Sequence, residues 1–363
     1  MKWKLDSPRA RVPLLILALF SLLLGLISAL QRLGYDIPLP HPSLPALHGP
    51  LMVTAFLGAL ISLERAVARK TSLAYSAPIL SALGIGFTLA FPNQLYGPLL
   101  FTISAFLLSL LLIRVFLQYS EIHFMIMSAG ALSWFIGNLW WGAGKFLFQV
   151  VPWWMGFLLL TIVAERLELS RIFPPRPLAR IWFLVSNGVL ILAMTLTNYF
   201  YVPGLRLMGL SLLALTGWLF LNDVARHTVT TSGLPKFTAW SLLSGYAWLA
   251  VTGWLALLAP VQQAGFYYDA FLHTFFVGFV FSMIFGHAPI IFPAILDLKI
   301  HFHNRFYFHL ILLHIGLLVR TISDLIYWMP GKQIGGVLNV LAILLFLINN
   351  ARSILQAKKS TSG

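Results

Sequence analysis

Histidine is the residue type in this sequence with the widest scope for chemistry. The chain has ten histidines and no cysteine, and a neutral imidazole is the commonest metal ligand in proteins. An ionisable ring inside an apolar run is costly in lipid, which makes it a candidate functional residue. Five rings lie in or beside long apolar runs: His48, His273, His287, His309 and His314. The sequence therefore predicts metal ligation within a membrane.

Two of these histidines, one from each of two separate segments, could bind the same metal ion. His273 and His287 would lie about 21 Å apart along one helix, so they cannot bind the same ion. A haem iron with two imidazole ligands instead needs one histidine from each of two facing helices. We expect His48 and His273 to be these axial ligands, in the outer leaflet. Considered alone, His48 is more often an interface residue bonded to water or a carbonyl.

Small and sulfur-containing side chains accompany both histidines. Gly58 and Gly278 lie farther along the same runs, and a glycine lets a flat macrocycle approach a helix backbone. Met52 follows His48 by one helical turn, which places its thioether on the same face. We expect Met52 to contact the haem or, alternatively, to bind the iron.

The remaining three histidines form a second candidate group at the inner side of the membrane. His287 is followed by Pro289, which bends a helix and frees a carbonyl group. His309 and His314 lie on the next apolar run. Imidazole suits both iron and copper, so a second haem or a copper ion is one interpretation. The rings could equally be bonded to each other, to Asp297 or to water.

The absence of cysteine limits the chemistry further. It excludes disulfides, iron–sulfur clusters, thiolate metal sites and the covalent attachment of c-type haem. Any haem must be held non-covalently, as b-type haem is.

The composition indicates a membrane protein. Of 363 residues, 59% are hydrophobic and 9% are charged, against roughly 25% charged in an ordinary soluble domain. The net charge of +14 could suggest nucleic acid, but the Lys and Arg residues lie in short loops between apolar runs. We therefore expect membrane lipid, and no nucleic acid, around this chain.

About twelve apolar runs are long enough to cross a bilayer. They predict an all-α integral membrane protein in which residues 1–363 form a single polytopic domain, with an uncleaved first span. The expected spans are 12–31, 47–68, 73–91, 95–117, 121–144, 146–168, 179–199, 204–222, 237–259, 268–290, 306–328 and 334–352.

The loop charges predict the orientation. Most Lys and Arg residues fall on the side that holds both ends of the chain, and the positive-inside rule makes that side cytoplasmic. Trp140, Trp141, Trp153 and Trp154 flank a connection on the other side, at the depth that indole rings favour. The sequence predicts both ends inside, in the inner membrane of the cell.

Two acidic–basic pairs echo each other at the inner ends of two predicted spans. They are Leu63-Glu64-Arg65-Ala66 and Ala164-Glu165-Arg166-Leu167. A weak internal repeat is one interpretation. We favour the other, in which both arginines anchor their helices at the lipid–water interface.

Two segments resemble known families. The segment His-Gly-Pro-Leu-Met-Val-Thr-Ala-Phe-Leu-Gly, from His48 to Gly58, resembles the haem-ligand segment of haem-copper oxidase and nitric oxide reductase catalytic subunits. The segment from His273 to His287, with Gly278, Met283 and Gly286 at matching spacing, resembles the NnrS family of haem- and copper-containing membrane proteins. That family is associated with nitric oxide stress and denitrification.

The resemblance implies a bundle like that of the haem-copper oxidases, with axial roles for His48 and His273 and a cofactor contact for Met283. This chain also departs from the oxidase pattern. Phe271 and Phe275 flank His273, where the family has a second histidine. The spans 146–168 and 179–199 contain no histidine, so the oxidase copper site is absent as such.

These features lead to one functional expectation and one rival. We expect a haem-binding protein that handles nitric oxide or transfers electrons in the membrane, with a quinone or a redox protein as partner. The rival is a secondary transporter without a cofactor, favoured by twelve spans and by Arg114, Glu165, Arg320 and Asp324 near or within them.

Overall fold

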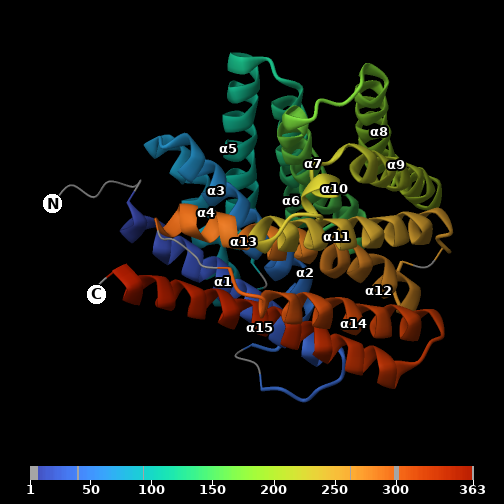
Figure 1. The fold of residues 1–363 in the computed structure, drawn as a ribbon. Coiled ribbons are helices and arrows are strands. Elements are labelled where there is room, and N and C mark those ends of the chain that lie inside the picture. The colour runs from blue at the N-terminus through green and yellow to red at the C-terminus, as the bar shows by residue number, and fades with distance from the viewer. Residues whose placement is uncertain (1–6, 39–40, 93, 262, 298–301, 362–363) are drawn as a thin grey trace. The chain divides into compact units, whose positions relative to one another are not determined.

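Helices make up the described structure. The computed structural model describes residues 7–38, 41–92, 94–261, 263–297 and 302–361, and within these ranges it has helices and turns but no strand. The predicted all-α class is therefore confirmed (Figure 1). By its internal contacts the chain divides into two compact units, residues 1–164 with 294–297, and residues 165–293 with 298–363. A single polytopic domain over 1–363 stays a prediction.

The first unit is built on six long helical segments. They are α1 (Pro8–Arg32), a continuous run over Leu44–Arg69, α4 (Ser76–Ala90) after the short η3 (Ser72–Tyr75), α5 (Tyr96–Tyr119), α6 (Ile122–Gly142) and most of α7 (Leu147–Leu169). The run over Leu44–Arg69 combines η1 (Leu44–Leu47), α2 (His48–Pro50), η2 (Leu51–Gly58) and α3 (Ala59–Arg69). Within the unit, α5 packs against α4 and α6, and η2 packs against α1.

The second unit contains the end of α7 and the later helices. They are η4 (Ser170–Ile172), α8 (Pro177–Leu196), α9 (Tyr201–Asn222), α10 (Ala225–Thr228), α11 (Gly233–Leu257), α12 (Phe266–His273), η5 (Thr274–Val280), most of α13 (Phe281–Leu296), α14 (Phe306–Leu325) and α15 (Met329–Thr361). In this unit α14 packs against α15, and α9 packs against both α8 and α11. In addition, α11 packs against η5 and α12 packs against α14. The α14–α15 pair is the orange and red hairpin of Figure 1.

The faces of α8 are arranged as lipid requires. Leu178, Ile181 and Leu192 are more than half exposed, whereas Ser186 and Asn187 on the same helix are buried. A soluble protein would place the apolar side chains inside and the polar ones in water. This reversed pattern supports a helix whose outer face meets lipid.

Eleven helices in the described ranges are long and apolar enough to cross a membrane. Each overlaps one of the twelve predicted spans. The twelfth predicted span, 237–259, is occupied by the 25-residue helix α11, which is not among the eleven. The structure is thus an all-helical, multi-span bundle.

Two segments of π-helix interrupt the long helices. They are η2 (Leu51–Gly58), which begins three residues after His48, and η5 (Thr274–Val280), which begins directly after His273. A π-helical turn is rare and occurs often at functional sites. Both segments follow histidines that the sequence had already singled out.

Gly209 provides a test of the packing between α9 and α11. A Cβ atom at Gly209 would lie 2.6 Å from the Gly253 carbonyl oxygen and 2.6 Å from the Leu257 nitrogen. Backbone atoms cannot rotate away, so we expect Gly209→Ala to destabilise the protein by about 1–3 kcal/mol. Reversible unfolding in detergent micelles measures this change. The matched control is Gly188→Ala on α8, where a Cβ would meet nothing within 4 Å; equal stability of the two variants would contradict the close crossing.

Candidate functional site

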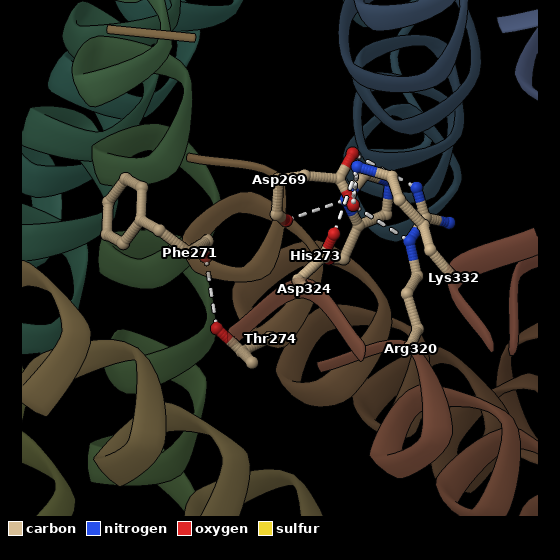
Figure 2. A network of polar contacts seen from close by, with 7 residues as sticks. All are labelled: Asp269, Phe271, His273, Thr274, Arg320, Asp324 and Lys332. Carbon is tan, nitrogen blue, oxygen red and sulfur yellow. Dashed lines mark hydrogen bonds and ion pairs between the residues drawn. The ribbon is translucent and has the colours of Figure 1, made fainter. Parts of the chain in front are cut away.

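The candidate site centres on His273 and Asp269, one helical turn apart on α12. The Nδ1 atom of His273 lies 2.8 Å from the Asp269 carbonyl oxygen and 3.3 Å from its carboxylate oxygen Oδ2. Figure 2 shows the two side chains beside Arg320, Asp324 and Lys332. We call this group of five the outer charge cluster, because the sequence predicts His273 in the outer leaflet.

Arg320 and Lys332 balance the two carboxylates of the outer charge cluster. The Arg320 guanidinium donates two hydrogen bonds to Asp269, at 2.9 and 3.1 Å. The Lys332 ammonium lies 3.3 Å from Asp269 Oδ2 and 3.0 Å from Asp324 Oδ1. The Asp324 side chain has no exposed surface, so its charge needs such a partner. The cluster thus combines two carboxyl groups with two cationic side chains.

The α14–α15 hairpin brings the cluster together. Arg320 and Asp324 are one turn apart on α14, and Lys332 lies in the first turn of α15. The connecting residue Tyr327 has a φ of 57°, which turns the chain sharply. A Cβ at Gly335 would lie 2.6 Å from the Arg320 nitrogen, so this glycine permits close contact between the two helices.

The hydrogen bonds of His273 determine its tautomer. A carbonyl oxygen and a carboxylate oxygen only accept hydrogen bonds, so the proton of the neutral ring is on Nδ1. The lone pair then lies on Nε2, and among the described residues no hydrogen bond reaches that atom. This is the arrangement of metal-binding histidines, whose second nitrogen donates to a carbonyl or carboxylate.

His48 has the same tautomer in the first unit. Its Nδ1 lies 2.9 Å from the carbonyl oxygen of Gly25 on α1, so Nδ1 donates and the lone pair lies on Nε2. Met52 packs on the same glycine, because a Cβ at Gly25 would lie 2.5 Å from the Met52 sulfur. Gly25 on α1 therefore contacts both residues of this run that are predicted to bind haem, His48 and Met52.

No free lone pair is present on His287, His309 or His314. His287 Nδ1 donates to the Met283 carbonyl oxygen at 2.6 Å, and its Nε2 accepts from Arg166 at 2.8 Å. Trp248 donates to His314 Nδ1 at 3.0 Å, and the Asn349 amide donates to His309 Nδ1 at 3.1 Å. Each lone pair is therefore already bound to a donor.

The geometry around His287, His309 and His314 does not favour the second metal site, which stays a prediction. Within the described ranges, no group of three or more His, Asp or Glu side chains is placed to hold a metal ion. On α14, His309 and His314 are five residues apart, so their side chains point about 140° away from each other. Neighbouring Trp, Asn and Arg side chains use these rings as hydrogen-bond acceptors instead.

The sequence matches one family model over nearly its whole length. The model is that of a domain of unknown function, DUF8744, and it covers residues 11–355. The chain belongs to the DUF8744 family. No curated protein and no solved structure matches it.

The glycines predicted to face a macrocycle contact tryptophan in this member of the DUF8744 family. A Cβ at Gly58 would lie 2.1 Å from the Trp134 ring. A Cβ at Gly278 would lie 2.6 Å from Trp248. The methyl group of Met283 lies against Gly245 in the same way, at 2.5 Å from a Cβ there. Helix packing alone accounts for all three positions.

Arg166 is the clearest correction to a predicted role. We expected an interface anchor, but its side chain is 5% exposed and lies between His287 and Asp223. The Arg166 Nε is 4.0 Å from Asp223 Oδ2. Burial raises the pKa of Asp223 above its ordinary value, although Arg166 and the Ala225 amide act to lower it. The Arg166 side chain is therefore part of the buried interior.

Sequence reasoning also missed Asp269 and Lys332. A signal was present for Asp269, because it precedes His273 by four residues and so shares its helix face. Lys332 gave no such signal, since it lies in the predicted loop between spans 306–328 and 334–352, where a lysine is ordinary. Its role depends on the turn between α14 and α15.

Proposed function

We propose that this chain binds b-type haem non-covalently in the cytoplasmic membrane, with His273 as an axial ligand. In this proposal the protein transfers electrons in the membrane or handles nitric oxide, as its resemblance to the NnrS family suggests. The proposed architecture has twelve spans, both ends inside, and a bundle like that of the haem-copper oxidases.

The observation that supports the proposal most is the hydrogen bonding of His273. Its Nδ1 proton is held by Asp269, so Nε2 keeps the lone pair that binds iron. His287, His309 and His314 use their lone pairs within the protein. The π-helical segment after His273 is a second feature that favours a functional site there.

The residues around His273 fit an apolar cofactor with one polar edge. Phe271 and Phe275 are buried beside it, and Arg320 and Lys332 hold the carboxylate that orients the ring. When bound, haem supplies a one-electron redox centre and, at an open axial position, a binding site for a diatomic gas. The protein residues fix the ring and keep water from it. A quinone or a redox protein is the proposed partner.

The absorption spectrum of the purified protein tests this proposal. We expect a Soret band and visible bands that change on reduction, after expression with ample haem. A stable but colourless protein would contradict the proposal and favour the rival. That rival, a secondary transporter, draws its support from the charged side chains of the outer charge cluster inside membrane helices.

The orientation is tested separately. A reporter fused after α15 should be active only in the cytoplasm, and one inserted at Ala264 only outside, because the positive loop residues stay inside. Alkaline phosphatase and a fluorescent protein report the two sides. The opposite pattern would place His273 at the inner side and overturn the proposed depth.

A further inference from the structure

We propose that Asp269 is a positioning residue that sets the reduction potential of the haem iron through His273. This inference rests on the proposed function, because it requires an iron on Nε2 of His273. It assigns a role to the Asp269 carboxylate, which lies beside Nδ1 of the His273 ring. The iron would bind at the other ring nitrogen, Nε2.

The contacts of Asp269 carry the inference. One proton on His273 Nδ1 faces two acceptors of the same residue, the carbonyl oxygen at 2.8 Å and Oδ2 at 3.3 Å. The Arg320 fork holds both carboxylate oxygens, at 2.9 and 3.1 Å. Such a bidentate pair fixes the plane of the carboxylate. Asp269 therefore stays against the ring.

The direction of the effect follows from charge. A carboxylate that accepts the Nδ1 proton makes the ring a stronger electron donor to a metal at Nε2. A stronger donor stabilises the ferric iron over the ferrous iron, so it lowers the reduction potential. Arg320 and Lys332 draw on the same carboxylate, which makes its effect on His273 weaker than that of an isolated carboxylate.

Asp324 offers a matched control within the same cluster. It has the same side chain as Asp269, and it pairs with the same ammonium group at 3.0 Å. Among the described contacts it has none with His273. Asp269→Asn and Asp324→Asn therefore make the same change of side chain in the same cluster, but only the first removes the carboxylate from the ring.

The experiment compares these two variants as full-length, haem-loaded protein. Spectroelectrochemistry measures the reduction potential, and electron paramagnetic resonance of the ferric low-spin haem reports the axial ring. We expect Asp269→Asn to raise the potential and change the g values. A tenfold preferential loss of ferric affinity corresponds to about 59 mV for one electron. Asp324→Asn should shift the potential by less and leave the g values unchanged. Equal shifts in the two variants would overturn the inference.

Arg320→Lys provides a second test if Asp269→Asn does not fold. The substitution keeps the charge but removes the bidentate fork, which leaves the carboxylate a better acceptor for His273. We expect a lower potential and altered g values, whereas an effect of charge alone predicts no change. An unchanged protein would overturn the inference.

Failure of the proposed function gives a different result. A wild-type protein without haem, or a His273→Ala variant with an unaltered haem spectrum, would remove the basis of both proposals. Haem that depends on His273 but is insensitive to Asp269 and to Arg320→Lys would remove only this inference.

Discussion

His273→Ala is expected to abolish the low-spin haem spectrum of the purified protein. The imidazole supplies one axial bond, so its loss leaves a five-coordinate, high-spin haem or no haem. Even the loss of an outer partner of a metal ligand costs about 10–100-fold in metal affinity. Removing the ligand itself should cost more. Absorption spectra and the ratio of haem to protein measure the effect.

His314→Ala is the matched control for this result. His314 also lies in a membrane helix of the second unit, but its Nδ1 lone pair accepts a hydrogen bond from Trp248. We expect His314→Ala to keep the wild-type spectrum. His227→Ala, a change at an exposed position, should keep it as well. A low-spin spectrum that survives His273→Ala and vanishes in His314→Ala would reverse the assignment.

His48→Ala tests the sequence-based prediction of the other axial ligand. The tautomer of His48, with Nδ1 bonded to the Gly25 carbonyl, is the one required of a ligand that binds through Nε2. We expect this variant to lose the six-coordinate signature as well. Met52→Leu preserves the side-chain volume, and a high-spin product there would identify Met52 as the ligand instead.

The helices could be predicted well from the sequence because lipid imposes a simple rule. A chain that crosses a bilayer must form long apolar helices, and long apolar runs are visible without a structure. The helix α11 shows where the rule is weakest. Its tryptophan, glycine and serine residues make it less hydrophobic, although it fills the predicted span 237–259.

The candidate site could be predicted only in part, because hydrogen bonding decides which histidines remain available. The spacing of His273 and its apolar neighbours singled it out as a candidate, and the structure leaves its side chain 16% exposed. The same reasoning could not separate it from His287, because the donor to His287 is Arg166, more than a hundred residues earlier in the chain. Partners so distant in sequence leave no local pattern.

The glycines show a related limit. A glycine in a membrane helix signals that something large lies close, but it does not say what. Gly58 admits Trp134 and Gly278 admits Trp248, where the sequence suggested a porphyrin. The tryptophans were visible in the sequence, yet their pairing with these glycines depends on how the helices pack.

Lys332→Met is expected to cause the largest loss of stability among single changes in the outer charge cluster. Lys332 is the cation that contacts Asp324, whose side chain has no exposed surface. Removing one partner of a buried ion pair typically lowers the free energy of unfolding by about 3–5 kcal/mol, because the other charge stays buried without a partner. Asp269 keeps its bidentate bond to Arg320, so the damage should be confined to Asp324.

Charge balance gives a rescue that a simple packing defect would not show. Adding Asp324→Asn to Lys332→Met removes the stranded anion and leaves the Asp269–Arg320 pair intact, so most of the lost stability should return. Reversible unfolding in detergent micelles, arranged as a double-mutant cycle, measures the coupling. Lys236→Met, at an exposed position of α11, should change stability by less than about 0.5 kcal/mol. If the double variant is less stable than Lys332→Met alone, Lys332 acts through its packing on Phe266 and not through its charge.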